Sequence, residues 1–227
     1  MAKRCAQTFT LLAVCAVFNA RAGGTADAVY TASYFEVAPR SISEAVALLR
    51  EYRRATAREE GRIGIDALQQ IGRPDHFAML ERWENQQAIE THNNAEPTRH
   101  LRERLQAIAL APYDQRVLKP PIAQAPEFRG TGRTVYVLTH ADAIPPIPAA
   151  LAALDPLAEA SRHEPGNLRF DVLPQLNRQN HFTIVEVWQD ERARDAHAAA
   201  VHTKEFREQF QRITGSLYDE RLYRALD

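Results

Sequence analysis

Residues 77–83 and 182–188 are the two clearest strand-like stretches of the chain, and in both the alternate positions carry a matching set of residues. Because successive side chains of a strand point to opposite faces, this period of two predicts a strand in each stretch. One face of each strand carries two apolar residues, a glutamate and a tryptophan: Phe77, Met79, Glu81 and Trp83 in the first, and Phe182, Ile184, Glu186 and Trp188 in the second. The same strand face therefore occurs twice, 105 positions apart.

The flanking patterns predict the same series of elements around both strands. A run of β-branched and aromatic residues, 29–35 or 135–139, predicts a first strand. Apolar residues then recur at helical spacing in 45–55 and in 151–158, where Pro156 predicts a break. Four further elements follow: a strand, the strand named above, a helical region and a short last strand. In the first copy they span 63–68, 77–83, a region that ends near 111, and 113–118. In the second copy they span 168–173, 182–188, a region that ends near 215, and 218–223. The order βαββαβ is that of a ferredoxin-like α+β domain.

The repeat extends over almost the whole chain. A shift of 105 positions superimposes about 90 residues without a gap, which is longer than the ~20–50 residues of a solenoid unit and fits a small globular domain. We therefore expect one domain at residues 29–118 and another at 133–227. Residues 119–132 are rich in proline and glycine and are expected to form a linker.

The first 22 residues have the features of a secretory signal. Lys3 and Arg4 precede a mostly apolar run at residues 9–18, and Ala20-Arg21-Ala22 fits a signal peptidase site. The apolar run is shorter than the ~20 residues of a transmembrane helix. We interpret residues 1–22 as a signal peptide and expect the mature protein to be periplasmic or secreted.

Composition narrows the chemistry of the mature chain. Both cysteines, Cys5 and Cys15, lie in the leader, which excludes disulfides and thiolate nucleophiles after processing. The chain has 28 basic and 29 acidic residues and no basic patch. We therefore expect no nucleic-acid partner and no stable membrane insertion after processing.

An ordered set of motifs in the second copy carries a resemblance to a known family. The set consists of Glu164-Pro165-Gly166, His181-Phe182, Glu186-x-Trp188 and His197-x-x-x-x-His202-Thr203-x-x-Phe206. The first copy keeps Gly61, His76-Phe77, Glu81-x-Trp83 and His92 but has Glu59-Glu60 before the glycine and Pro97 opposite His202. In these positions the chain resembles the antibiotic biosynthesis monooxygenase superfamily, most of all its quinol monooxygenase-like members.

The resemblance implies both an architecture and a range of activities. Members form dimeric α+β barrels, so the two copies are expected to pack as an intrachain pseudo-dimer, and a homo-oligomer of whole chains is also allowed. Characterised relatives oxidise small aromatic phenols or quinols with O2 and use no metal, flavin or other cofactor. Others on this fold bind or degrade haem, and a ligand-binding protein without catalysis is a third alternative.

Cofactor-free oxidation of a phenol requires a base, because the phenolate is the electron donor to oxygen. His197 and His92 are the candidate bases, since histidine titrates near neutrality. Each follows a strand tryptophan by nine residues, so Trp188 and Trp83 are expected to form an aromatic wall beside it. The other candidate substrate-binding residues are polar groups near these positions: Glu186, Glu81, Tyr218, Tyr113 and His202.

Structural roles are the alternative for each of these residues. The histidines can pack or cap their helices, the tryptophans and tyrosines can fill the core, and the glutamates can pair with Arg207 and Arg102. A metal site is not expected, because His197 and His202 would lie about 140° apart around one continuous helix. A break in the helix near His202 would bring them together. Of the two copies, the second keeps more of the motif set and is expected to hold the working site.

The leader generates the first prediction. Because signal peptidase would cut after Ala22, the native mature protein should begin near Gly23 and be recovered outside the cytoplasm. N-terminal sequencing of the native protein tests this. An intact Met1 or Ala2 on protein from the cytoplasmic fraction would contradict it.

Overall fold

The structure is a computed structural model that describes residues 27–121, 128, 130–144, 147–216 and 219–226. The expected signal peptide and half of the expected linker lie outside the described residues. Within them, no helix is both long and apolar enough to cross a bilayer.

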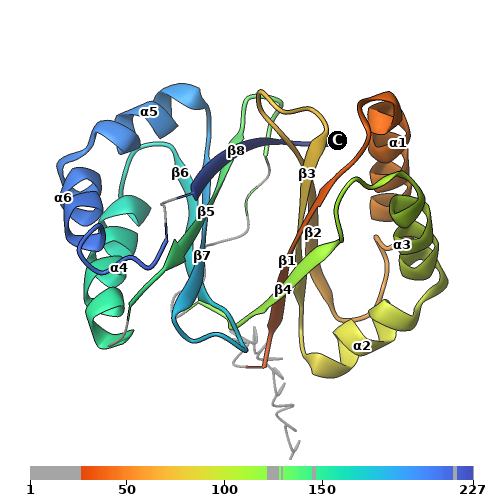
Figure 1. Ribbon diagram of the computed structural model, residues 1–227, viewed down its shortest axis with the longest axis horizontal. Helices are drawn as coiled ribbons and strands as arrows, with labels where there is room; N and C mark the ends of the chain where they lie inside the picture. The colour runs from red at the N-terminus through yellow and green to blue at the C-terminus, as the bar shows by residue number, and fades with distance from the viewer. Residues whose placement is uncertain (1–26, 122–127, 129, 145–146, 217–218, 227) are drawn as a thin grey trace, which may run out of the picture.

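Both copies have the predicted order of elements. The first contains β1 (Val29–Glu36), η1 (Pro39–Ser41), α1 (Ile42–Ala55), β2 (Arg62–Gln70), β3 (His76–Trp83), α2 (Gln86–Asn94), α3 (Glu96–Ile108) and β4 (Asp114–Leu118). The second contains β5 (Val135–Asp142), α4 (Ile147–Arg162), β6 (Asn167–Pro174), β7 (His181–Trp188), α5 (Glu191–Ala199), α6 (Val201–Phe210) and β8 (Asp219–Ala225). The strands lie at the centre and the helices on the two outer sides (Figure 1).

One eight-stranded sheet runs through both copies, in the order β4-β1-β3-β2-β8-β5-β7-β6. The last strand, β8, pairs with β2 of the first copy, and Gln70 lies opposite Tyr223. At the other edge Leu118 bridges to Gln175, and the Lys119 N–H donates to the Pro174 carbonyl at 2.8 Å. The two junctions join equivalent positions of the repeat, so the sheet closes around a pseudo-two-fold axis. The predicted ferredoxin-like repeats and the intrachain α+β barrel are therefore confirmed.

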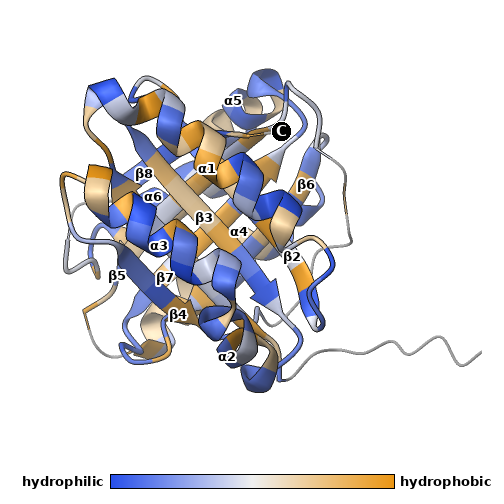
Figure 2. Ribbon diagram, turned by 90° about the vertical axis from the view of Figure 1, so that its right-hand side faces the viewer, coloured by the Kyte–Doolittle hydropathy of each residue, from blue (hydrophilic) through white to orange (hydrophobic). Residues whose placement is uncertain are grey.

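The two faces of each sheet are buried by different partners. The face that carries Trp83 packs on α1, α2 and α3 of its own copy, and the face that carries Trp188 packs likewise on α4, α5 and α6. Alternate residues of the same strands, such as Leu80 and Val185, meet inside the barrel. Figure 2 looks onto the helices of the first copy, along which hydrophilic and hydrophobic residues alternate.

One expectation about the helices is wrong, and one predicted helical region proves to be divided. α4 continues through Pro156 instead of breaking there. Both Pro156 and Ala152, whose carbonyl loses its intrahelical donor, are exposed, so water can satisfy that carbonyl. The second helical region of each copy is divided in two, because Ala95 and Ala200 have extended backbone with ψ near 150°.

Helices α2 and α5 begin at matching side-chain caps. Asn85 accepts a hydrogen bond from the Ala88 N–H at 2.9 Å, and Asp190 accepts one from the Ala193 N–H at 3.0 Å. Each cap satisfies one N–H of a first helical turn that lacks a backbone partner. The cap fixes where the helix starts after the tryptophan strand, and so fixes the position of the histidine it carries.

Gly166 generates the second prediction. It has a φ of 85°, and a Cβ atom there would lie 2.6 Å from the Cβ of Ala193 on α5. Gly72 has a similar φ of 80° but nothing within 4 Å. Gly72→Ala should reduce the free energy of unfolding by about 1–2 kcal/mol through backbone strain alone. Gly166→Ala should reduce it by roughly 1–3 kcal/mol more, through overpacking. Equal losses in urea titrations of the two variants would show that the contact with α5 relaxes freely.

Candidate functional site

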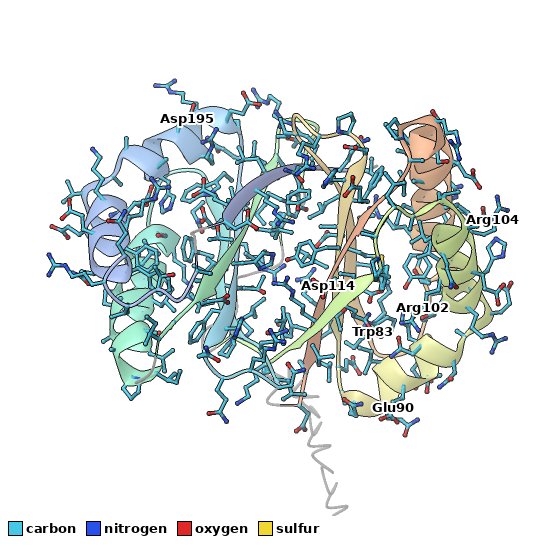
Figure 3. The ribbon with its side chains drawn as sticks, in the orientation of Figure 1. Trp83, Glu90, Arg102, Arg104, Asp114 and Asp195 are labelled. Atoms are coloured by element: carbon cyan, nitrogen blue, oxygen red, sulfur yellow. The ribbon has the colours of Figure 1, made fainter. Side chains whose placement is uncertain are left out.

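Each candidate histidine lies against its strand tryptophan. The ring centroids of Trp83 and His92 are 4.2 Å apart, and those of Trp188 and His197 are 4.7 Å apart with an interplanar angle of 27°. Both tryptophans are fully buried. Figure 3 shows Trp83 between the sheet and the helices of the first copy. The structure therefore brings together the tryptophan–histidine pairs that the sequence spacing predicts, one pair in each copy.

In the first copy the histidine belongs to a closed hydrogen-bond network. His92 Nδ1 lies 2.5 Å from Glu59 Oε2, and its Nε2 lies 2.6 Å from the Tyr52 hydroxyl. That hydroxyl donates to Glu81 Oε1 at 2.7 Å, and the Thr31 hydroxyl donates to Glu81 Oε2 at 3.0 Å. Tyr52 has a single proton and gives it to Glu81, so His92 must donate from Nε2 to Tyr52 as well as from Nδ1 to Glu59. His92 is therefore an imidazolium that lies between the carboxylates of Glu59 and Glu81.

The pKa shifts agree with that assignment of protons. Burial alone would raise the pKa of Glu81, but the hydrogen bonds and charge of His92 outweigh it and hold the pKa below its usual value. Burial alone would lower the pKa of His92, yet Glu81 and Glu59 raise it above its usual value. Both ring nitrogens of His92 are engaged, which leaves no lone pair for an incoming substrate.

In the second copy the corresponding network is open. Leu157 stands at the position of Tyr52, and Val137 stands at the position of Thr31, so two hydroxyl donors are missing. Glu186 accepts instead from Trp188 Nε1 at 2.9 Å. Burial raises the pKa of Glu186 to about 8, against the lowering effect of the hydrogen bond from Trp188. This carboxyl is consequently protonated at neutral pH.

His197 keeps one firm hydrogen bond. Its Nδ1 lies 2.7 Å from Glu164 Oε1, whereas its Nε2 lies 3.6 Å from Glu186 Oε2 and 3.5 Å from the Thr203 hydroxyl. Burial lowers the pKa of His197, although Glu164 acts in the opposite direction. The ring is therefore neutral, with its proton on the Nδ1 that faces Glu164 and its lone pair on Nε2.

His202 shares the same carboxylate oxygen. Its Nε2 lies 2.6 Å from Glu164 Oε1, and its side chain is 29% exposed. The break at Ala200 directs the first turn of α6 back toward Glu164, which one continuous helix would not do. Glu164 thus links the buried His197 to a histidine at the surface. The first copy has Pro97 in place of His202 and cannot form this link.

The remaining candidate residues lie away from this cluster. Tyr113 stacks on Phe35 with centroids 5.8 Å apart and lines a cavity of about 520 Å³ with Arg102. Tyr218 lies outside the described residues. The expected pairing of the glutamates with arginines is not seen: Arg102 donates to Asn93, and Arg207 pairs with Glu220 at 3.0 Å while acting on Glu186 as a nearby charge.

Sequence reasoning missed the partners of both histidines. Glu59 and Glu164 occupy equivalent positions of the repeat, so a search for matched carboxylates would have found them. Tyr52 has a leucine as its counterpart and gives no such signal.

A second cavity opens at the mouth of the barrel, where the two copies meet. It has a volume of about 840 Å³ and is lined by polar residues of both copies, among them Asp114, Arg116, His140, Asp219 and Arg221. Tyr34 and His140, which are equivalent positions of β1 and β5, meet there with their ring centroids 4.9 Å apart. His140 Nδ1 accepts a hydrogen bond from Arg116 at 2.9 Å, so its ring is neutral.

Comparison with known protein families agrees with this fold. The family model for antibiotic biosynthesis monooxygenase matches residues 28–104 and 148–209, which together are more than half of the chain. Among curated proteins, none matches the sequence.

Several solved structures have the same fold over both copies. A proposed monooxygenase from Fusobacterium nucleatum is 17% identical, with a TM-score of 0.81 over 89% of this chain and 94% of its own. One from Lactobacillus acidophilus is 18% identical, with a TM-score of 0.72 over 88% and 95%. An anthrone oxidase-like protein is 14% identical, with a TM-score of 0.67 over 88% and 91%. The TM-scores and coverages establish a shared two-copy fold, and at these identities they establish the fold alone.

His140 generates the third prediction. Burial, reinforced by Arg116 and Arg221, lowers its pKa from 6.5 to about 4. As the pH falls below 6.5 the unfolded chain takes up the proton first, so folding stability declines until the pH reaches about 4. The expected loss is up to about 3 kcal/mol, since one pKa unit is worth about 1.4 kcal/mol.

His140→Gln retains an acceptor for Arg116 but cannot titrate. The free energy of unfolding of this variant should therefore depend less on pH between 6.5 and 4 than that of the parent. Asp114 and Asp219 also face His140 and are present in both proteins, so they do not contribute to the difference. Parallel pH profiles of parent and variant would show that His140 is not held neutral in the barrel.

Proposed function

The chain belongs to the antibiotic biosynthesis monooxygenase family, and from this premise we propose that it oxidises a small aromatic phenol or quinol with O2. The proposed reaction uses side chains of the protein and the electrons of the substrate, with no cofactor in the chemical step. We place the reaction in the second copy, at His197. The leader further leads us to propose that the enzyme works in the periplasm or outside the cell.

The observation that carries the proposal is the difference between the two histidines. Glu164 orients His197 through Nδ1, and the Nε2 lone pair has no hydrogen-bond partner at normal distance. A carboxylate on one nitrogen of an imidazole and a free lone pair on the other is the arrangement of a general base. In the first copy the Tyr52 hydroxyl lies 2.6 Å from His92 Nε2, so that nitrogen is already engaged in a hydrogen bond.

The proposed chemistry begins with transfer of the phenolic proton to His197 Nε2. The phenolate then transfers electrons to O2, and one oxygen atom bonds to a ring carbon that loses its hydrogen. A phenol that takes up one O2 in this way yields a quinone and one water, so atoms and electrons balance without an external reductant. The proton on His197 can leave through Glu164 and His202, because His202 reaches the solvent.

The surroundings of His197 suit a reactive aromatic anion. His197 is only 4% exposed, and Trp188 covers one face of its ring. A substrate ring must displace side chains that cover the imidazole, and once bound it is shielded from water by the sheet and helices. The neutral carboxyl of Glu186 lies beside Nε2 and can donate a hydrogen bond to a developing oxyanion. The anthrone oxidase-like neighbour, whose name refers to a polycyclic aromatic compound, adds support for an aromatic substrate.

The fourth prediction tests the base. Oxygen uptake by chelator-treated protein should be measured across a panel of phenols, quinols and anthrone. His197→Ala should lower the rate by about 10²–10⁴-fold, as loss of a general base typically does. His92→Ala serves as the matched control, because it removes the equivalent histidine from the closed network and should affect the rate much less.

Circular dichroism should show that both variants remain folded. Equal losses of rate in the two variants would point to two equivalent sites. Undiminished turnover in His197→Ala would remove this histidine from the mechanism.

A further inference from the structure

We propose that Glu164, His197 and His202 form a binding site for a divalent transition-metal ion, for which zinc is the best suited. This goes beyond the proposed oxidation and is independent of it. One ligand atom from each residue, two imidazole nitrogens and a carboxylate oxygen, lies within 4.8 Å of the others. Two histidines and one carboxylate are an established set of three protein ligands for zinc.

The distances allow an ion to enter with little rearrangement. Glu164 Oε1 lies 2.7 Å from His197 Nδ1 and 2.6 Å from His202 Nε2. Ligand atoms that surround zinc tetrahedrally at about 2.1 Å lie roughly 3.4 Å from one another. Each of the two contacts therefore needs to widen by only roughly 0.7 Å, which small side-chain rotations of Glu164 and the partly exposed His202 can provide.

The break between α5 and α6 creates this set of ligands. On a continuous helix, two residues five positions apart would lie about 140° from each other around the axis. The extended backbone of Ala200 instead places His197 at the end of one helix and His202 in the first turn of the next, and both face Glu164. The sequence argued against a metal site on one continuous helix, and the break at Ala200 is what allows the site to form.

The groups behind His197 fit a role as a metal ligand. Trp188 stacks on the ring, and Phe170 meets it edge-on with centroids 5.7 Å apart, so the orientation of the imidazole is fixed. Its second nitrogen faces Glu186 at 3.6 Å. An oxygen acceptor behind a metal-bound histidine is the usual way in which proteins orient such a ligand, and the carbonyl oxygen of the neutral Glu186 carboxyl can take that role after a small approach.

The donor atoms select the class of ion. Two imidazoles favour zinc and neighbouring ions such as cobalt over magnesium and calcium, which prefer oxygen ligands. The side chains of Glu164 and His202 are 15% and 29% exposed, so water can complete the coordination of an ion held there. Because His197 and Glu186 are buried behind them, the ion would sit at the inner end of a short approach from the surface.

A metal ion on His197 and the role of His197 as a general base require different tautomers of the ring. The expected effect of the ion on the oxidation rests on the proposed function. An ion on Nδ1 displaces the proton to Nε2, and the Nε2 lone pair that would accept the phenolic proton is lost. The ion would also occupy Glu164 and His202, the route by which that proton leaves. Zinc should therefore inhibit the oxidation.

The fifth prediction tests binding directly. Tag-free, chelator-treated full-length protein should be titrated with Co²⁺, followed by its visible ligand-field absorption, and then with Zn²⁺ in competition. We expect saturable binding of one equivalent and displacement of cobalt by zinc. His202→Pro should abolish this binding, and it should leave the fold intact because Pro97 occupies the same position of α3 in the first copy.

Two further variants serve as controls. Pro97→His supplies a third residue beside Glu59 and His92, but both ring nitrogens of His92 carry protons there, so this variant should add no second equivalent of binding at neutral pH. His76→Gln alters the other cluster of metal-ligating residue types among the described residues, Glu36, Asp75 and His76, and should leave the cobalt spectrum unchanged.

The outcomes separate this inference from the proposed function. No saturable cobalt or zinc binding, or binding that survives His202→Pro, would overturn the metal site and leave the base role of His197 untouched. Zinc that binds in the parent with the expected loss in His202→Pro, yet leaves the oxidation rate unchanged, would uphold the site and contradict the proposed base.

Discussion

The need to bury both faces of each four-stranded sheet determines the rest of this structure. The helices of a copy cover only the face that carries its tryptophan, Trp83 or Trp188. The opposite face is also apolar, with Leu80 on β3 and Val185 on β7, and only the other copy covers it. Neither copy has a complete core alone, since an exposed face of this kind must be buried against another layer. The sheets therefore close into a barrel, and the space between each sheet and its helices is the remaining place for a small buried site.

Fusion of the two copies in one chain allows their buried networks to differ. Identical subunits would carry the same residues on both sides of the axis. Here tyrosine and leucine occupy equivalent positions 52 and 157, and proline and histidine occupy equivalent positions 97 and 202. The first exchange removes a hydroxyl from the second copy and frees Nε2 of its histidine. The second adds an imidazole on the other side of the same carboxylate. The first exchange, together with Val137 in place of Thr31, thus separates a closed ionic network from an open one on the same order of helices and strands.

The fold could be predicted from the sequence to a greater extent than the site. The pattern of alternate residues around Trp83 and Trp188, and an offset of 105 residues between the copies, were sufficient to identify the repeat, whereas the barrel was expected from the resemblance to the family. They were insufficient at Pro156, because the effect of a proline on a helix depends on whether the freed carbonyl faces solvent. The tryptophan–histidine contacts followed from spacing along a strand and a capped helix. The contact of Glu164 with His197 did not, because 33 residues separate them and a loop of that length has no fixed geometry before the fold is known.

The pairing of β8 with β2 has a consequence for the order of events during synthesis. β2 belongs to the first copy, yet the strand that covers its free edge is the last one in the chain and ends at Ala225. The edge of β2 therefore stays unpaired on the ribosome until the rest of the second copy, up to β8, has emerged. An unpaired strand edge is a template for pairing with other chains. This places the greatest risk of aggregation before β8 has been synthesised, and a product that stops short of β8 cannot cover this edge.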